Sequence, residues 1–177
     1  MRPGGPQMLR SLEAVMGLPE LKHESERWKI VLGNQTMKIS AAVAMTAWKQ
    51  LVPFTIENPF MSLIWLAPAF RALARRRGVS DVRTDFCQWG TPWMKPTRIL
   101  GGHVDMSIVA RTCRMRKGIC SRSGCRHVVL AGLNKDKVFM TKLAEPYPPS
   151  FASQLAKVHV NAQRAKMMNS MTEACLR

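Results

Sequence analysis

The sequence is poor in acidic residues. Its 177 residues include eleven Asp and Glu against 27 Lys and Arg, which gives a formal net charge of +16 at pH 7. Such an excess of cations is typical of a chain whose partner is a polyanion: nucleic acid, an anionic membrane surface or a large ribonucleoprotein. Of these we expect nucleic acid. A basic protein kept in solution by its charge, or a fragment without its acidic part, would have the same composition.

Long apolar runs are also missing. A membrane-spanning helix needs about 18 consecutive apolar residues, and the best candidate, residues 60–73, is short and interrupted by Pro68 and Arg71. The N-terminal residues 1–6 lack the apolar core of a secretory signal. We therefore expect no membrane partner and no secretion. The expected location is intracellular: the nucleus, the cytoplasm or an organelle matrix.

The chain has five cysteines, an odd number, and three of them are close together in the sequence. Without a secretory signal, reduced thiols are expected rather than disulfides. Apolar residues make up 46% of the chain, which is typical of a globular protein with a buried core. The length corresponds to one domain of roughly 100–200 residues.

The N-terminal part combines turn-forming residues with helical periodicity. Residues 1–34 are rich in Gly and Pro and are expected to be irregular, except for a short helix over 24–32 that Gly33 and Asn34 would end. Apolar residues at three- and four-residue steps predict a second helix over 35–51.

Short strand patterns alternate with helical ones in the rest of the chain. The expected strands are 54–56, 79–86 and 97–100, with a hairpin of 127–131 and 138–142. The expected helices are 60–77, restarted at Pro68, and a last one from Pro148-Pro149 towards 168. This alternation is typical of an α/β fold. We expect an irregular segment over 1–34, an α/β domain over 35–168 and a frayed C-terminus over 169–177.

Ile56-Glu57-Asn58-Pro59 places an acid and an amide directly after an apolar strand. In open α/β sheets, ligands bind beyond the carboxyl ends of the strands. Glu57 and Asn58 are therefore candidate ligand-binding residues. The alternative is a polar strand end whose Asn58 caps the following helix.

A second segment of interest follows the strand over 79–86. The loop Gln88-Trp89-Gly90-Thr91-Pro92-Trp93-Met94-Lys95-Pro96-Thr97-Arg98 places aromatic rings beside cations. Such rings stack on bases and such cations contact phosphate. Trp89 and Trp93 are therefore candidate nucleic-acid-binding residues, although either can instead be a core residue.

Together the two segments resemble the target-base half of the DNA cytosine-5 methyltransferases, especially those of phages and mobile elements. Ile56-Glu57-Asn58-Pro59 matches the family's Glu-Asn strand end, and residues 87–98 are similar to its Tyr-Gly-x-Pro-x-x-(Lys/Arg) loop. The resemblance covers residues 30–157. It implies a partial Rossmann-like methyltransferase fold with a basic Cys-rich insertion, and DNA rather than RNA as partner.

The same resemblance assigns roles at the target base. Glu57, with Asn58 beside it, would grip the Watson–Crick edge of a cytosine flipped out of the duplex. Lys95 and Arg98 would help to hold the base and its phosphate, and Trp89 would occupy the aromatic position of the loop.

Two parts of that family are missing from the sequence. The family's nucleophile is a Cys in a Pro-Cys loop before the Glu-Asn strand, whereas the first cysteine here, Cys87, follows Glu57. No strand is followed by a Gly-rich loop that would hold S-adenosylmethionine. We therefore expect a DNA-binding, methyltransferase-like domain that is inactive alone. The alternatives are one half of a split methyltransferase, completed by a second chain that supplies the cofactor-binding half, and a basic structural component of a ribonucleoprotein such as an organellar ribosome.

The stretch 111–127 contains four soft metal ligands: Cys113, Cys120, Cys125 and His127. Tetrahedral Zn²⁺ takes such a set, and four protein ligands would make the site closed and structural. The alternative is a basic loop whose cysteines are partly packed inside.

Clustered cations are candidate phosphate contacts. They are Arg75, Arg76, Arg77, Arg114, Arg116, Lys117 and Arg122. For the run of three arginines over 75–77, the alternative is a solvated last helical turn that interacts with the helix dipole.

Overall fold

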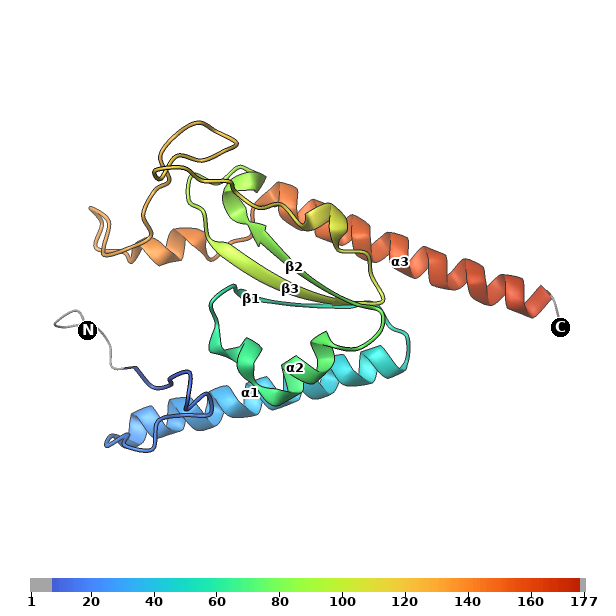
Figure 1. Ribbon diagram of the computed structural model, residues 1–177, viewed down its shortest axis with the longest axis horizontal. Helices are drawn as coiled ribbons and strands as arrows, with labels where there is room; N and C mark the ends of the chain where they lie inside the picture. The colour runs from blue at the N-terminus through green and yellow to red at the C-terminus, as the bar shows by residue number, and fades with distance from the viewer. Residues whose placement is uncertain (1–7, 176–177) are drawn as a thin grey trace.

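A small antiparallel sheet lies between helices on both of its faces (Figure 1). The computed structural model describes residues 8–175, without the side chains of 169–170 and 173–175. The strands are β1 (Phe54–Pro59), β2 (Val79–Asp85) and β3 (Pro96–Gly102), in the spatial order β1-β3-β2. The helices are α1 (Glu24–Lys49), α2 (Pro68–Ala74) and α3 (Pro149–Cys175). Short 3₁₀ turns cover Leu63–Leu66, Phe86–Trp89, Ser107–Val109 and Met140–Ala144.

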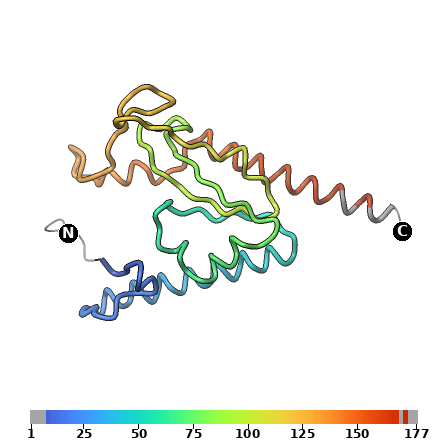
Figure 2. The backbone as a smooth tube through the Cα atoms, viewed as in Figure 1, coloured from blue at the N-terminus to red at the C-terminus, as the bar shows by residue number. Residues whose placement is uncertain are grey.

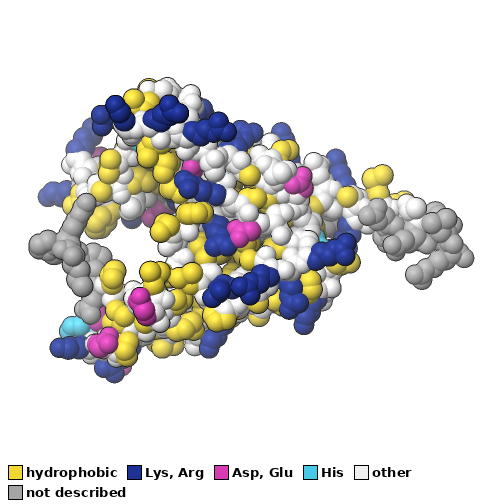
Figure 3. Space-filling view, in the orientation of Figure 1, with side chains coloured by type: hydrophobic (Ala, Val, Ile, Leu, Met, Phe, Trp, Pro, Cys, Tyr) yellow, Lys and Arg dark blue, Asp and Glu magenta, His cyan; other side chains and the backbone are white. Residues whose placement is uncertain are grey.

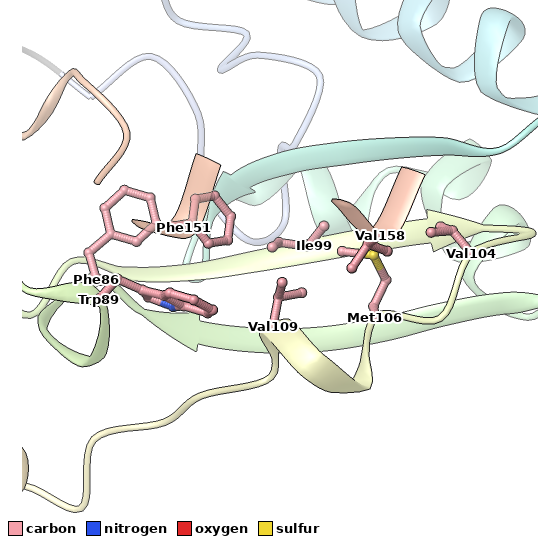
Figure 4. Packing of buried hydrophobic residues seen from close by; sticks show 8 residues of the cluster. All are labelled: Phe86, Trp89, Ile99, Val104, Met106, Val109, Phe151 and Val158. Carbon is pink, nitrogen blue, oxygen red and sulfur yellow. The ribbon is translucent and has the colours of Figure 1, made fainter. Parts of the chain in front are cut away.

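Each face of the sheet has its own core because side chains alternate along β3. Leu100 packs with α1 and α2, in a cluster that includes Trp65 and Phe70. Ile99 points to the other face and packs against α3. Figure 4 shows this second core, in which Phe86, Trp89 and Phe151 gather at one end.

The strand directions bring three chain segments to one edge of the sheet. β1 and β2 are both antiparallel to β3, so they run parallel to each other. Their connection passes through α2, as parallel strands require a crossover. The carboxyl ends of β1 and β2 therefore lie beside the start of β3, where Asp85 pairs with Pro96 and Asn58 with Arg98. We call this the carboxyl edge.

The expected mixture of helix and strand is confirmed, with all three strands of the sheet close to their expected positions. The sheet has three strands in an antiparallel arrangement, which fits an α/β class without being specifically Rossmann-like.

The predicted helix break at Gly33 and Asn34 is wrong, because α1 is one continuous helix across it. Both residues instead contact the N-terminal segment, which packs against α1 at this point. Arg10 Nη1 donates to Asn34 Oδ1 at 2.8 Å, and Asn34 Nδ2 donates to the carbonyl of Met16 at 2.8 Å. A Cβ at Gly33 would lie 2.8 Å from Arg10 Nη2, so Gly33 makes room for the guanidinium.

The predicted hairpin of 127–131 and 138–142 is also wrong. Within the described residues this region contains a single isolated bridge, between Leu133 and Phe139. Only the turn is formed, since Asn134 Oδ1 accepts the backbone N–H groups of Asp136 and Val138, each at 2.9 Å. The alternating side chains have no layer to pack against: Val129 is 74% exposed.

α3 begins at Pro149, as expected, and continues to Cys175. Its packed face consists of Phe151, Leu155, Val158 and Ala162. The helix then extends past the sheet (Figure 2). None of the helices within residues 8–175 has both the length and the apolar character that a bilayer crossing demands.

Candidate functional site

Four metal-ligating side chains meet at the carboxyl edge. The sulfur atoms of Cys87, Cys113 and Cys120 and a ring nitrogen of His127 all lie within 4.8 Å of one another. Cys87 lies in the 3₁₀ turn that follows β2, whereas the other three come from the stretch 111–127, which we call the metal loop. Cys87 and Cys120 are buried, and the other two are half-buried.

Two of the distances between these atoms are close to those of a tetrahedral site. Cys113 Sγ lies 3.9 Å from Cys120 Sγ and 3.8 Å from His127 Nε2. Ligands placed about 2.0–2.3 Å from a tetrahedral zinc ion are about 3.3–3.8 Å apart from one another. Because the cluster spans up to 4.8 Å, an ion at its centre requires some ligand atoms to move inward by up to about 1 Å.

Asp85 fastens the metal loop to the sheet. Its carboxylate is fully buried, accepts the backbone N–H of Cys113 at 2.7 Å and pairs with Arg83 at 3.0 Å. Its own backbone N–H donates to the Arg111 carbonyl at 2.8 Å. The last residue of β2 thus sets the position of the first ligand of the loop.

A tight turn sets the position of Cys120. Gly124 donates its N–H to the Cys120 carbonyl at 3.0 Å, and Cys120 donates its N–H to the Cys125 carbonyl at 2.8 Å. Gly124 has a φ of +70°, a conformation that glycine adopts without strain. The turn directs the Cys120 side chain inward.

The two buried thiols differ in acidity. Burial raises the pKa of Cys87 to about 12. Burial also raises the pKa of Cys120, but the N–H groups of Ser123 and Arg122, the Ser123 side chain and His127 outweigh it and lower this pKa to about 6. Of the two, Cys120 is therefore the one that loses its proton more easily, and a cation would bind its thiolate first.

Further N–H and O–H groups point at the sulfur atoms. Gln88 Nε2 lies 3.5 Å from Cys87 Sγ and 3.8 Å from Cys120 Sγ. The backbone N–H and the hydroxyl of Ser121 approach Cys113 Sγ at 3.5 and 3.6 Å. Outer groups of this kind orient metal ligands and stabilise thiolate charge.

The residues present fit a metal ion. His127 directs Nε2 towards the thiols, while its Nδ1 is buried with no hydrogen-bond partner among the described residues. Nε2 is therefore the ring nitrogen that would bind an ion, and Nδ1 would remain unpaired. Three thiols and one imidazole form the soft donor set that zinc sites use.

The predicted ligand set needs one correction: the fourth member is Cys87 and not Cys125. Cys125 is exposed, and its sulfur atom lies 3.6 Å from the Ser123 carbonyl. It sits on the outer side of the turn that directs Cys120 inward. Cys87 was overlooked because it is 26 residues from Cys113 in the sequence, yet its place directly after a strand was a usable signal.

Glu57 and Asn58 lie at the carboxyl edge, on opposite faces of β1. Glu57 pairs with Ile99 and therefore faces the α3 side, where Tyr147 donates its hydroxyl proton to Glu57 Oε2 at 2.9 Å. Burial, followed by this hydrogen bond, raises the pKa of Tyr147 to about 12. Asn58 points to the α1 side and lines a cavity there.

The two cations that the resemblance assigns to the target base are held by internal partners. Lys95 Nζ donates to the Ala144 carbonyl at 2.5 Å and lies 4.9 Å from the centre of the Phe86 ring. Arg98 forms a two-pronged ion pair with Asp81. Its guanidinium also covers the Trp65 ring at 4.9 Å.

Of the two tryptophans proposed to stack on bases, Trp89 is a core residue. It is 6% exposed, and its Nε1 donates to Thr84 Oγ1 at 2.7 Å. Arg111 covers its ring at 4.0 Å. Trp93 is half-buried, with its Nε1 enclosed and unpartnered among the described residues.

The predicted phosphate-contacting cations are exposed and form two groups. One group lies on the metal loop and comprises Arg114, Arg116, Lys117 and Arg122. The other, Arg75, Arg76 and Arg77, lies at the opposite end of β2, where Arg76 covers the Trp48 ring at 4.9 Å. Lys and Arg side chains gather along the upper edge of Figure 3, over the metal loop of Figure 1.

Comparisons of the chain with protein-family models, with curated proteins and with solved structures gave no match.

Proposed function

We propose that this chain binds nucleic acid, with DNA as its first candidate, through the metal loop, and that a zinc ion holds this loop in shape. The observation that carries the proposal is the meeting of three thiols and an imidazole within 4.8 Å in a loop whose cations are exposed. A closed metal site without an open position has a structural role.

Zinc is favoured over other ions by the donors. Thiolate and imidazole suit zinc, whereas magnesium, calcium and manganese prefer oxygen ligands. Structural zinc contributes about 10–16 kcal/mol of apparent binding free energy in small zinc-finger peptides. A contribution well below that range would still fix the irregular metal loop, which contains no named strand or helix.

Three of the four loop cations, Arg114, Arg116 and Lys117, are free to meet phosphate, whereas Arg122 Nε donates to the Cys87 carbonyl. The ion pairs recorded among the described residues are Arg83–Asp85 and Arg98–Asp81, and neither involves the loop. Unpaired cations concentrated on one surface release counterions from DNA when they bind it, which makes the affinity dependent on salt.

The methyltransferase-like part of the proposal is supported by the connection from β1 through α2 to β2. β1 and β2 are parallel strands joined by a helical crossover, as in the units of Rossmann-like sheets, but the antiparallel β3 lies between them, so the connection is shared and the strand order is not. Glu57 and Asn58 stand at the carboxyl end of the first strand of this unit. Methyl transfer would require S-adenosylmethionine and a nucleophile from a second chain.

Fluorescence anisotropy with a labelled DNA duplex at several salt concentrations tests the binding proposal. Neutralising two loop cations in Arg116→Gln/Lys117→Gln removes two possible phosphate contacts. The slope of log K against log salt then becomes shallower by about 1.8, at about 0.9 per contact. The matched control, Arg75→Gln/Arg77→Gln, removes the same charge at the other end of β2 and changes the slope less. The proposal would be contradicted if no binding is seen at low salt, or if Arg116→Gln/Lys117→Gln changes neither the affinity nor its salt dependence.

A further inference from the structure

A cavity of about 320 Å³ lies between α1, the N-terminal segment and the turn after β1. It is separate from the metal cluster, because none of the four possible metal ligands is among the residues that line it. Pockets that hold small organic ligands begin at about 300 Å³ and combine apolar walls with a few convergent polar groups. The polar groups here are those of Arg10, Asn58 and Ser62.

Arg10 brings a positive charge to the cavity. Its guanidinium is held by neutral oxygens: the carbonyls of Val15 and Ile30 and the side-chain oxygen of Asn34. No carboxylate pairs with it among the described residues. A guanidinium has five N–H donors, so the three recorded bonds leave two for a ligand. A cation in such surroundings favours an anion, and phosphate fits its forked donors.

Asn58 and Ser62 bring uncharged hydrogen-bonding groups. The Asn58 amide has no side-chain partner among the described residues, and it offers one acceptor and two donors. Ser62 Oγ accepts the backbone N–H of Ile64 at 3.4 Å, which leaves its own O–H to donate. An amide of this kind can bond with the adjacent donor and acceptor on the edge of a nucleobase.

The remaining walls of the cavity are apolar. Val15, Met37 and Leu63 supply them. Aliphatic side chains and a methionine sulfur pack well against the flat faces of an aromatic ring. The cavity therefore combines a cation, an amide and apolar walls, which match the phosphate, the edge and the faces of one nucleotide.

We propose that this cavity binds one nucleotide, a nucleoside 5′-monophosphate unit, with its base edge on Asn58 and its phosphate on Arg10. The unit is either free or part of a single strand. This inference rests on the proposed function and gives it a base-binding residue. In this proposal Asn58 contacts the base. Glu57 does not, because it is hydrogen-bonded to Tyr147 on the other face of the strand.

Isothermal titration of the full chain with dAMP, dCMP, dGMP and dTMP tests the inference, with inorganic phosphate as the comparison ligand. Anisotropy with a labelled single strand tests the strand-borne form. Asn58→Asp keeps the shape of the side chain, replaces the amide donors by a carboxylate and repels phosphate. It is expected to weaken binding at least tenfold. The matched control is Asn161→Asp, the same change at an exposed position on α3, which is expected to leave binding unchanged.

The outcomes separate the sources of the ligand. A mononucleotide that binds the wild type but not Asn58→Asp supports a site for the free ligand. If Asn58→Asp weakens binding of the labelled single strand but not of the mononucleotides, the cavity binds a nucleotide that is part of a strand. If inorganic phosphate binds as tightly as the nucleotides, the cavity is only an anion site and the inference is overturned. The inference is also overturned if Asn58→Asp changes neither mononucleotide binding nor single-strand binding.

Two further measurements separate a loss of binding from a loss of folding. Thermal unfolding of Asn58→Asp shows whether the variant is folded, and Arg10→Lys, which keeps the charge but loses the fork, supplies a second variant at the phosphate end. Duplex binding through the metal loop is measured on the same proteins. If Asn58→Asp binds the duplex, the mononucleotides and the single strand as the wild type does, the inference fails and the proposed function stands.

Discussion

Among single residues, Trp89 shows how burial decides between two roles for one side chain. In the sequence it is an aromatic ring beside cations, which is the pattern of a base-stacking residue. In the structure it is enclosed by Phe151 and Arg111 and bonded to Thr84. Its contribution therefore belongs to folding and not to contact with a partner.

Trp89→Phe is expected to destabilise the fold without changing DNA binding. The substitution removes the donor to Thr84 Oγ1 and part of a buried ring, a loss of about 1–3 kcal/mol in the free energy of unfolding. Urea unfolding measures the loss, and anisotropy measures binding at a temperature where the variant is folded. Trp28→Phe, at a site 61% exposed on α1, serves as the control. Lost DNA affinity with unchanged stability would assign Trp89 to the interface instead.

Tyr147 permits a direct measurement at the carboxyl edge, because it is the only tyrosine of the chain. Its raised pKa means that the folded protein favours the neutral phenol. This contribution to stability is present below about pH 10 and is lost as the pH rises through about 12. Ultraviolet titration of the phenolate should give a midpoint near 12.

Glu57→Gln tests the cause of that shift. It removes the negative charge beside the phenol, so the midpoint should move down while burial keeps it above the ordinary value. Circular dichroism of the same samples shows whether the chain is folded at each pH. A folded wild type with a midpoint near 10, or a Glu57→Gln variant with an unshifted one, would refute the Tyr147–Glu57 contact.

Among the elements, α1 shows what a contact between distant segments does to a local signal. Gly33 and Asn34 are a typical helix end, yet the helix continues. The pair faces Arg10 and Met16, so its sequence reflects the docking of the N-terminal segment. The three strands of the sheet and the starts of α2 and α3 were predictable because strand patterns and the positions of proline are local properties. The continuity of α1 was not, since it depends on a segment about twenty residues away.

The metal centre was predictable only in part, for the same reason. Cys113, Cys120 and His127 are close in sequence and also meet in space. Cys87 joins them because β2 ends beside the metal loop, and the spacing of cysteines does not contain that information. The roles of Glu57 and Asn58 separate for a simpler reason, since neighbours on a strand point to opposite faces.

Asn34→Ala tests the docking of the N-terminal segment on α1. The variant loses the hydrogen bonds to Arg10 and to the Met16 carbonyl, worth about 1–3 kcal/mol together, while alanine improves the local helix propensity. Hydrogen exchange should therefore become faster over residues 8–18 and remain slow in the middle of α1. Faster exchange throughout α1 would show that Asn34 supports the helix and not the segment docked on it.

At the scale of the whole molecule, two exposed groups of cations lie at opposite ends of β2. The group over 75–77 precedes β2 and the metal loop follows it. The run of three arginines lies at a helix end, whereas we propose that the metal loop depends on a bound zinc ion for its shape. On this proposal, removal of the metal weakens DNA binding by the loop and leaves the fold of the sheet in place.

We propose that Cys87, Cys113, Cys120 and His127 hold a zinc ion that shapes the metal loop. Elemental analysis of the purified chain and of two single variants measures the zinc content. The wild type and Cys125→Ser should each contain about one zinc per chain, and Cys87→Ser should lose most of it, since a closed site takes four protein ligands. Zinc retained in Cys87→Ser but lost in Cys125→Ser, or a wild type without zinc, would contradict the account.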